Sequence, residues 1–206
     1  PPRRLMNQVT RPATGRAPVE SSLVFAHGIA ALVTLLLSVT FGIIISFQLW
    51  APDLGADTTW LSWGRLRYAH TQGIMFGWLA NAFFAFLYHA VPRLTGRPVT
   101  SPRLGQWLFA LWNVAVMFPG WVLVLSGVSQ PLEWAEFPLV VDAVVVIGLV
   151  MAVVQFVPPF FSRGLDSLYV SSWYVIGALV FTVLAYPMGN IVPEFVPGAA
   201  GAAFSG

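Results

Sequence analysis

Residues 64–81 have the sequence GRLRYAHTQGIMFGWLAN, in which two arginines and a histidine stand at the start of a long apolar segment. This segment is one of five that are apolar enough to cross a hydrocarbon core, which requires about 20 residues of helix. The expected spans are residues 22–50, 68–92, 105–127, 138–162 and 168–192. The sequence therefore predicts an all-α fold, a polytopic membrane bundle of five transmembrane helices.

The composition agrees with a lipid environment. Hydrophobic residues make up 57% of the chain and charged residues 9%, whereas soluble domains carry about 25% charged residues. The net charge is +2, and the ten basic residues are arginines scattered between apolar runs, so no basic face for nucleic acid is expected. Without cysteine, disulfides, thiolate zinc sites and iron–sulfur clusters are excluded, and a bound metal needs nitrogen, oxygen or thioether ligands.

The arginines also predict the orientation. With a cytoplasmic N-terminus, eight of the ten lie on the inner side, as positively charged loops do. Residues 1–21 then form a cytoplasmic segment, residues 22–192 the membrane portion, and residues 193–206 an outer tail.

Arg65 and Arg67 are the two arginines on the predicted outer side, five and three residues before His70. Two guanidinium groups at a membrane surface suit a bidentate anion such as a carboxylate. The alternative is that they pair with Asp53, Asp57 or lipid headgroups.

His70, Gly73 and Gly77 lie close to one line along the expected helix, and Arg67 lies about 60° from that line. Haem matches these features, because iron takes an imidazole, a flat macrocycle needs small neighbours, and propionates take arginine. The alternative is that the glycines pack helices together and that the histidine forms an interfacial hydrogen bond.

A second axial ligand is hard to find in this sequence. His89 is nineteen residues after His70, about 28 Å along the helix, and His27 lies at a similarly unsuitable depth. Met188 is the one internal candidate at the right depth, and a packing methionine is the alternative. Either the haem site is absent, or the missing ligand belongs to polypeptide outside this chain.

Residues 64–98, GRLRYAHTQGIMFGWLANAFFAFLYHAVPRLTGRP, resemble the second transmembrane helix and following inner loop of the catalytic subunit I of haem-copper oxidases. The resemblance is closest to cbb3-type cytochrome c oxidases and their nitric oxide reductase relatives. LEWAEFPLVVDAVV (132–145) and LYVSSWYVIGALV (168–180) resemble later parts of the same subunit in the same order. Gln72, directly after the His-Thr pair, is not the particular polar residue that we expect at this position from the family pattern.

The resemblance implies site residues. His70 is expected to be an axial ligand of low-spin haem b, with Arg67 and Arg65 near the haem propionates and Gly73 and Gly77 beside the macrocycle. Glu133 and Glu136 match acidic residues that lie near the propionates and help to hold calcium. From their spacing alone, two solvated loop carboxylates are the alternative.

The resemblance also implies a function. The chain is expected to carry electrons from c-type cytochrome subunits or soluble cytochrome c towards oxygen, coupled to proton uptake, in a bacterial cytoplasmic (inner) membrane. Because subunit I of this family is longer, the resemblance implies that the chain is the N-terminal portion of a larger subunit, whose next helix follows residues 193–206, or one half of a split subunit. Haem b3 and copper are expected in the remainder of subunit I. The alternatives are a nitric oxide reductase subunit, a non-catalytic haem b anchor that uses His70 and Met188, and a cofactor-free transporter or assembly protein.

Two features inside the fourth expected span complete the predictions. Asp142 is an ionisable group within a span, which indicates either a structural role or a proton path. Pro158 and Pro159 lack amide donors, so we expect the helix to break or kink there.

Overall fold

The computed structural model describes residues 19–130, 132, 134–162, 164 and 168–196. Within these residues it is all-helical and contains no β-strand. Five helical segments are long and apolar enough to span a membrane: Ser21–Trp50, Trp63–Thr95, Pro102–Ser126, Leu139–Phe161 and Val170–Phe195. The predicted five-helix membrane fold is confirmed.

All spans except the first consist of more than one helical element. The first span is α1 (Ser21–Trp50), and a short 3₁₀ turn (Thr59–Leu61) precedes the second. The second and third spans are α2 (Trp63–Gln72), a π-helical segment (Gly73–Leu79) and α3 (Ala80–Thr95), then α4 (Pro102–Ala110), a π-helical segment (Leu111–Met117) and α5 (Phe118–Ser126). The fourth and fifth are α6 (Leu139–Phe156) with α7 (Pro158–Phe161), and α8 (Val170–Asn190) with α9 (Val192–Phe195).

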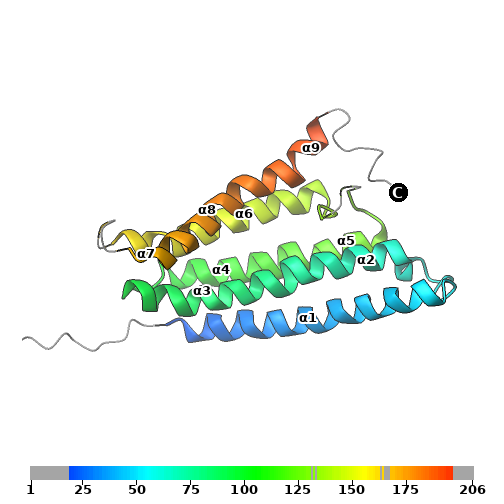
Figure 1. The fold of residues 1–206 in the computed structure, drawn as a ribbon, viewed down its shortest axis with the longest axis horizontal. Coiled ribbons are helices and arrows are strands. Elements are labelled where there is room, and N and C mark those ends of the chain that lie inside the picture. The colour runs from blue at the N-terminus through cyan, green and yellow to red at the C-terminus, as the bar shows by residue number, and fades with distance from the viewer. Residues whose placement is uncertain (1–18, 131, 133, 163, 165–167, 197–206) are drawn as a thin grey trace, which may run out of the picture.

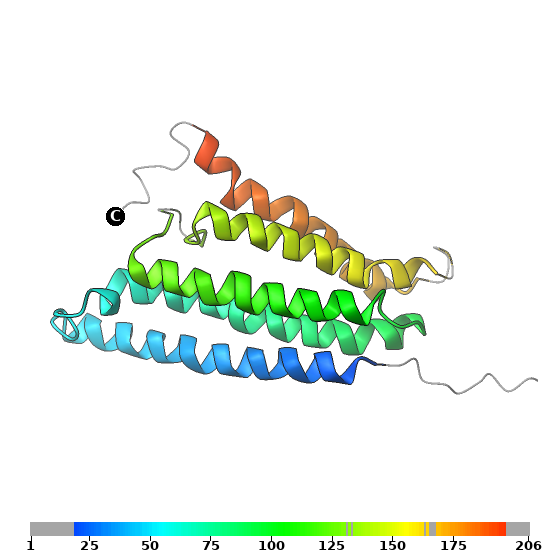
Figure 2. The same cartoon turned by 180° about the vertical axis from the view of Figure 1, so that it is seen from behind.

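The spans are arranged with α1 at one edge of the bundle and α8 at the other (Figures 1 and 2). Buried residues make up only 17% of the most apolar window of α1 and 11% of that in the fifth span, against 33% to 39% in the other three. We call the end that carries residues 50–63 the His70 end, and the end that carries residues 95–102 the His89 end.

Helix boundaries follow local signals. Gly96 and Gly127 adopt φ values of 68° and 90° and end α3 and α5 in the left-handed conformation that glycine permits. Ser101 caps α4 by accepting a hydrogen bond from the Leu104 amide. The helix of the fourth span is interrupted at Val157, between α6 and α7 and directly before the two prolines, as expected.

The second span begins at Trp63, five residues earlier than the expected residue 68. Arg65 and Arg67 therefore belong to the first turns of α2 and do not lie in a loop before it. Long arginine side chains can reach polar surroundings from within a helix end, which makes this extension compatible with a membrane.

Tryptophans join the second and third spans near their π-helical segments. The indole Nε1 of Trp121 donates to the Ala69 carbonyl at 2.9 Å, and that of Trp112 donates to the Phe76 carbonyl at 2.8 Å. A π-helical turn displaces carbonyls from the regular helical pattern, and such turns often occur at functional sites. The first of these tryptophan bonds lies directly beside His70.

Candidate functional site

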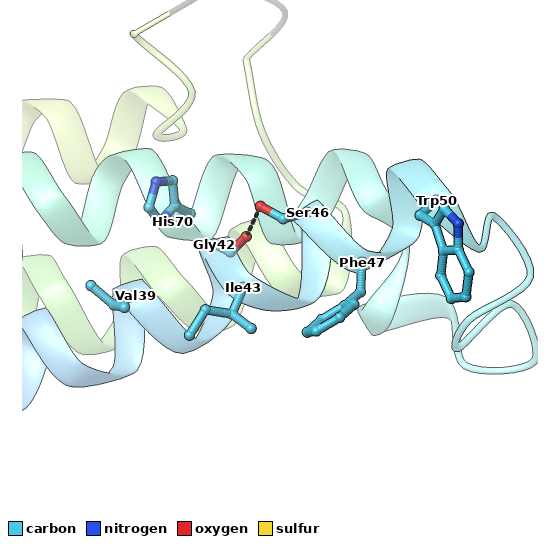
Figure 3. Close-up of a pocket in the computed structure, with 7 residues that line it drawn as sticks. All are labelled: Val39, Gly42, Ile43, Ser46, Phe47, Trp50 and His70. Atoms are coloured by element: carbon cyan, nitrogen blue, oxygen red, sulfur yellow. Dashed lines mark hydrogen bonds between the residues drawn. The ribbon is translucent and has the colours of Figure 1, made fainter.

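His70 lies about two turns into the second span, with its imidazole next to Gly42 of α1 (Figure 3). Its Nδ1 lies 2.7 Å from the backbone oxygen of Ser38. A carbonyl oxygen can only accept a hydrogen bond, so Nδ1 carries the hydrogen. In the neutral ring, Nε2 then keeps a free lone pair.

The His70 ring lines a pocket of about 780 Å³ along one face of α1. The other lining residues are Val39, Gly42, Ile43, Ser46, Phe47 and Trp50. Trp50 is 86% exposed and Phe47 57% exposed, so the pocket is open on one side. Among the described residues, Nε2 of His70 has no hydrogen-bond partner.

Gly73 and Gly77 face α1 and the third span. A Cβ at Gly73 would collide with the Ser38 hydroxyl and the Trp121 ring, and one at Gly77 would lie 2.7 Å from Cβ of Thr34. Both glycines thus permit close helix packing, which is the alternative that their spacing left open.

Arg65 is held by the third span. Its Nη1 donates to the Leu125 carbonyl at 3.2 Å, and a side chain at Gly127 would collide with the guanidinium group. This carbonyl lies at the C-terminal end of α5, where unpaired carbonyls carry partial negative charge. The alternative pairing of the arginines with Asp53 or Asp57 is not observed among the described residues.

Arg67 contacts aromatic rings and has fewer polar contacts than Arg65 among the described residues. Its guanidinium lies 4.6 Å from the centre of the Tyr68 ring and 5.8 Å from that of Trp63, and it forms no salt bridge with a described residue. Its hydrogen-bond donors therefore remain available for an anion at the His70 end.

Glu136 is buried against the second span, where its carboxylate accepts a hydrogen bond from the Gln72 side chain. Burial raises the pKa of the Glu136 carboxyl, and the Gln72 hydrogen bond and the charge of Arg67 act in the opposite direction. Glu133 lies outside the described residues. No group of three or more His, Asp or Glu side chains in the described part of the chain could hold a metal ion.

Asp142 is fully buried and joins three segments at the same end. The Gln130 amide donates to one carboxylate oxygen and the Tyr186 hydroxyl to the other, both at 2.6 Å. The network ties α6 to α8 and to the loop before α6. This geometry supports the structural interpretation of Asp142.

The other candidate iron ligands lie away from this pocket. His27 is buried and its Nδ1 lies 2.7 Å from the Asn81 side-chain oxygen, while His89 accepts a hydrogen bond from Arg93 at the His89 end. Met188 is 65% exposed and belongs to α8, the helix at the edge of the bundle opposite α1 (Figure 1). The structure does not bring Met188 and His70 together.

The residues around His70 fit a haem group. The fixed ring, the free Nε2 lone pair, the apolar lining and the nearby guanidinium of Arg67 are what an axial ligand site with propionates requires.

Sequence reasoning missed Ser38 and Gly42. A signal was present, because the small residues Thr34, Ser38, Gly42 and Ser46 recur every four positions and so share one face of α1. It also missed the hydrogen bond between Gln72 and Glu136, which no local sequence pattern predicts because the two residues are 64 positions apart.

Comparisons with known proteins agree with this architecture. Residues 22–204 match the family described as Cytochrome C and Quinol oxidase polypeptide I. A cbb3-type cytochrome c oxidase subunit CcoN1 from Stutzerimonas stutzeri is 32% identical over 142 residues, which cover 69% of this chain and 30% of that protein. Cytochrome c oxidase subunit 1 from Rhodobacter capsulatus is 28% identical over 160 residues, covering 76% of this chain and 30% of the relative.

The chain therefore spans about 30% of the length of these curated relatives. Its five apolar helices and the extent of the family match make it a multi-pass membrane protein of the same architecture. With the match extending over residues 22–204, the chain belongs to the cytochrome c and quinol oxidase polypeptide I family, the subunit I family of haem-copper oxidases.

Proposed function

We propose that this chain is the N-terminal part of the catalytic subunit of a respiratory terminal oxidase and that it binds low-spin haem b through Nε2 of His70. The observation that carries the proposal is the geometry of that imidazole. Ser38 fixes one nitrogen at 2.7 Å, and the ring borders an open pocket of about 780 Å³. A buried histidine with both ring nitrogens in hydrogen bonds would have no free lone pair with which to bind iron.

Bound haem supplies reversible one-electron chemistry. The chain's own residues hold and tune it. The Ser38 carbonyl keeps His70 in the tautomer that presents Nε2, the apolar face of α1 excludes water, and Arg67 directs positive charge towards the propionates. Arg65 contributes by securing the start of α2 to α5.

The remaining functions belong to the complete subunit. We propose that electrons arrive from c-type cytochrome subunits or soluble cytochrome c and pass to a haem b3–copper centre outside this chain, with coupled proton uptake. The relatives above are named as cytochrome c oxidases, which favours oxygen over nitric oxide as the substrate. Bacterial relatives and the arginine distribution favour an inner-membrane location with a cytoplasmic N-terminus.

Calcium has less support than haem. Glu136 is committed to Gln72, and the second acid of the expected pair, Glu133, lies outside the described residues. We therefore extend the proposal to haem b and to the oxidase cofactors alone.

The optical spectrum of the complete subunit tests the proposal. The reduced-minus-oxidised spectrum should contain a low-spin haem b band that is lost in His70→Ala and retained in His89→Ala and Met188→Leu. A His70→Ala protein that keeps this band would refute the assignment. Loss of the band in Met188→Leu would favour the anchor alternative.

A further inference from the structure

The interface between α1 and the second span is built from small residues in matched pairs. Thr34 faces Gly77 and Ser38 faces Gly73, with the glycine on the second span each time. In the third pair the glycine is on α1 instead, because Gly42 of α1 faces His70 of the second span. The two helices run antiparallel, so the three pairs form one continuous register.

Gly42 is the position at which this register makes room for the imidazole. A Cβ on Gly42 would lie 2.8 Å from Cε1, 2.9 Å from Nδ1 and 3.5 Å from Nε2 of His70. Separations below about 3 Å are repulsive, so any side chain at this position must displace the ring or push the helices apart.

The Ser38 carbonyl lies one helical turn before Gly42 on the same face of α1. The bond from Nδ1 of His70 to this carbonyl holds the ring in one orientation and one tautomer. A displacement of the ring by a side chain at residue 42 would lengthen this bond, because Nδ1 is one of the two ring atoms nearest to the new Cβ.

We propose that Gly42 is a positioning residue for the haem ligand His70, and that together with the Ser38 carbonyl it sets the ligand's orientation and donor strength. Helix α1 thereby tunes the redox potential of a haem that it does not ligate. A hydrogen bond from Nδ1 to a carbonyl makes Nε2 a stronger donor, which stabilises ferric iron and lowers the potential. This inference rests on the proposed function of His70.

The test is Gly42→Ala in the complete subunit, with Gly28→Ala as the matched control. Gly28 lies on the same helix, and a Cβ there meets nothing within 4 Å. Gly42→Ala should reduce haem b occupancy, change the electron paramagnetic resonance spectrum of the ferric haem and raise its midpoint potential. The expected rise corresponds to an about tenfold change in the ratio of oxidised to reduced haem, or about 59 mV for a one-electron couple. Gly28→Ala should match the wild type.

A rescue experiment separates positioning from general packing damage. In His70→Gly protein supplied with free imidazole, the ligand is no longer tethered and can shift away from residue 42. Adding Gly42→Ala to that protein should then leave the haem spectrum and potential unchanged. If the double variant shows the full effect of Gly42→Ala, the substitution acts by distorting the bundle and the inference is wrong.

The outcomes also distinguish this inference from the proposed function. If His70→Ala lacks low-spin haem b while Gly42→Ala has the potential and spectrum of Gly28→Ala, the haem assignment stands and the positioning role is refuted. If His70→Ala retains low-spin haem b, both fail. If the Gly42→Ala protein does not accumulate, the His70→Gly/Gly42→Ala protein with imidazole is compared with His70→Gly plus imidazole. Equal spectra and potentials support the positioning role, and a difference between them refutes it.

Discussion

His27 and His70 lie towards opposite ends of the same helix interface and differ in what surrounds them. His27 projects from α1 into a closed aromatic cage, with ring centres of Phe84, Tyr88 and Phe109 at 5.2, 5.6 and 4.9 Å. His70 projects from the second span towards α1 and borders an open pocket. The same residue type therefore packs against aromatic rings where the space around it is filled, and borders an open pocket, the proposed haem site, where it is not.

The difference is also visible in the hydrogen bonds. His27 bonds to Asn81, which in turn bonds to Asn113 and to the Gly77 carbonyl, so the histidine belongs to a network across three spans. Within the described part of the chain, His70 has a single hydrogen bond, to a main-chain carbonyl. Removal of His27 should thus damage the fold, whereas removal of His70 should damage the site.

The largest expected effect on stability is that of His27→Ala. The substitution leaves a cavity among three aromatic rings and removes a buried hydrogen bond, which together cost about 2–4 kcal/mol. Thermal unfolding of the detergent-solubilised complete subunit should show a clear decrease in Tm. His70→Ala, compared with wild type after haem removal from both, should show a much smaller decrease. Equal decreases would contradict the contrast between the two histidines.

Gly77→Ala tests the small-residue register between the two sites. A Cβ there lies 2.7 Å from Thr34 and 3.1 Å from Met117, so the helices must separate, at a cost of about 1–3 kcal/mol. The matched control is Gly28→Ala, which adds a methyl group in open space on α1. If the two variants unfold at the same temperature, the close packing at Gly77 has no energetic importance.

The two arginines of α2 should separate into a structural and a redox role. Arg65→Gln loses a hydrogen bond to the end of α5 and should cost about 1 kcal/mol, measured by thermal unfolding. Arg67→Gln should leave stability nearly unchanged and lower the haem b midpoint potential, because removal of positive charge disfavours the reduced state. A potential that changes in Arg65→Gln and not in Arg67→Gln would reverse this assignment.

The smallest expected effect concerns Glu136 and pH. Burial raises its pKa above the ordinary value of 4.5, so the folded state holds a proton that the unfolded state has already released. Stability should therefore fall as pH rises from about 4.5 through the raised pKa, with a slope of at most about 1.4 kcal/mol per pH unit. Glu136→Gln should flatten this part of the profile. An unchanged slope would show that another group causes it.

The fold was predictable because lipid imposes a simple rule. Runs such as residues 22–50 are long and apolar enough that a spanning helix is their main solution, and the observed α1 differs from the expectation by one residue at its start. The start of the second span was harder to predict, since Arg65 and Arg67 make residues 63–67 resemble a loop in composition although they are helical.

The site was only partly predictable. His70 and Arg67 stand out as polar groups at the edge of an apolar segment, and a resemblance to a known family gives them roles. The small residues of α1 mark its packing face, but the partner of His70 is a main-chain carbonyl, which every residue possesses, so the sequence does not identify Ser38 as that partner. The burial of Glu136 against Gln72 likewise depends on how a loop folds back over α2.

Chemical rescue of the His70 site tests the central claim most directly. In the complete subunit, His70→Gly should lose the low-spin haem b spectrum, and added imidazole should restore it by occupying the vacated ligand position. His27→Gly should retain the low-spin spectrum without imidazole, at reduced stability. Persistence of low-spin haem b in His70→Gly without added imidazole would show that His70 is not the ligand and would contradict the account.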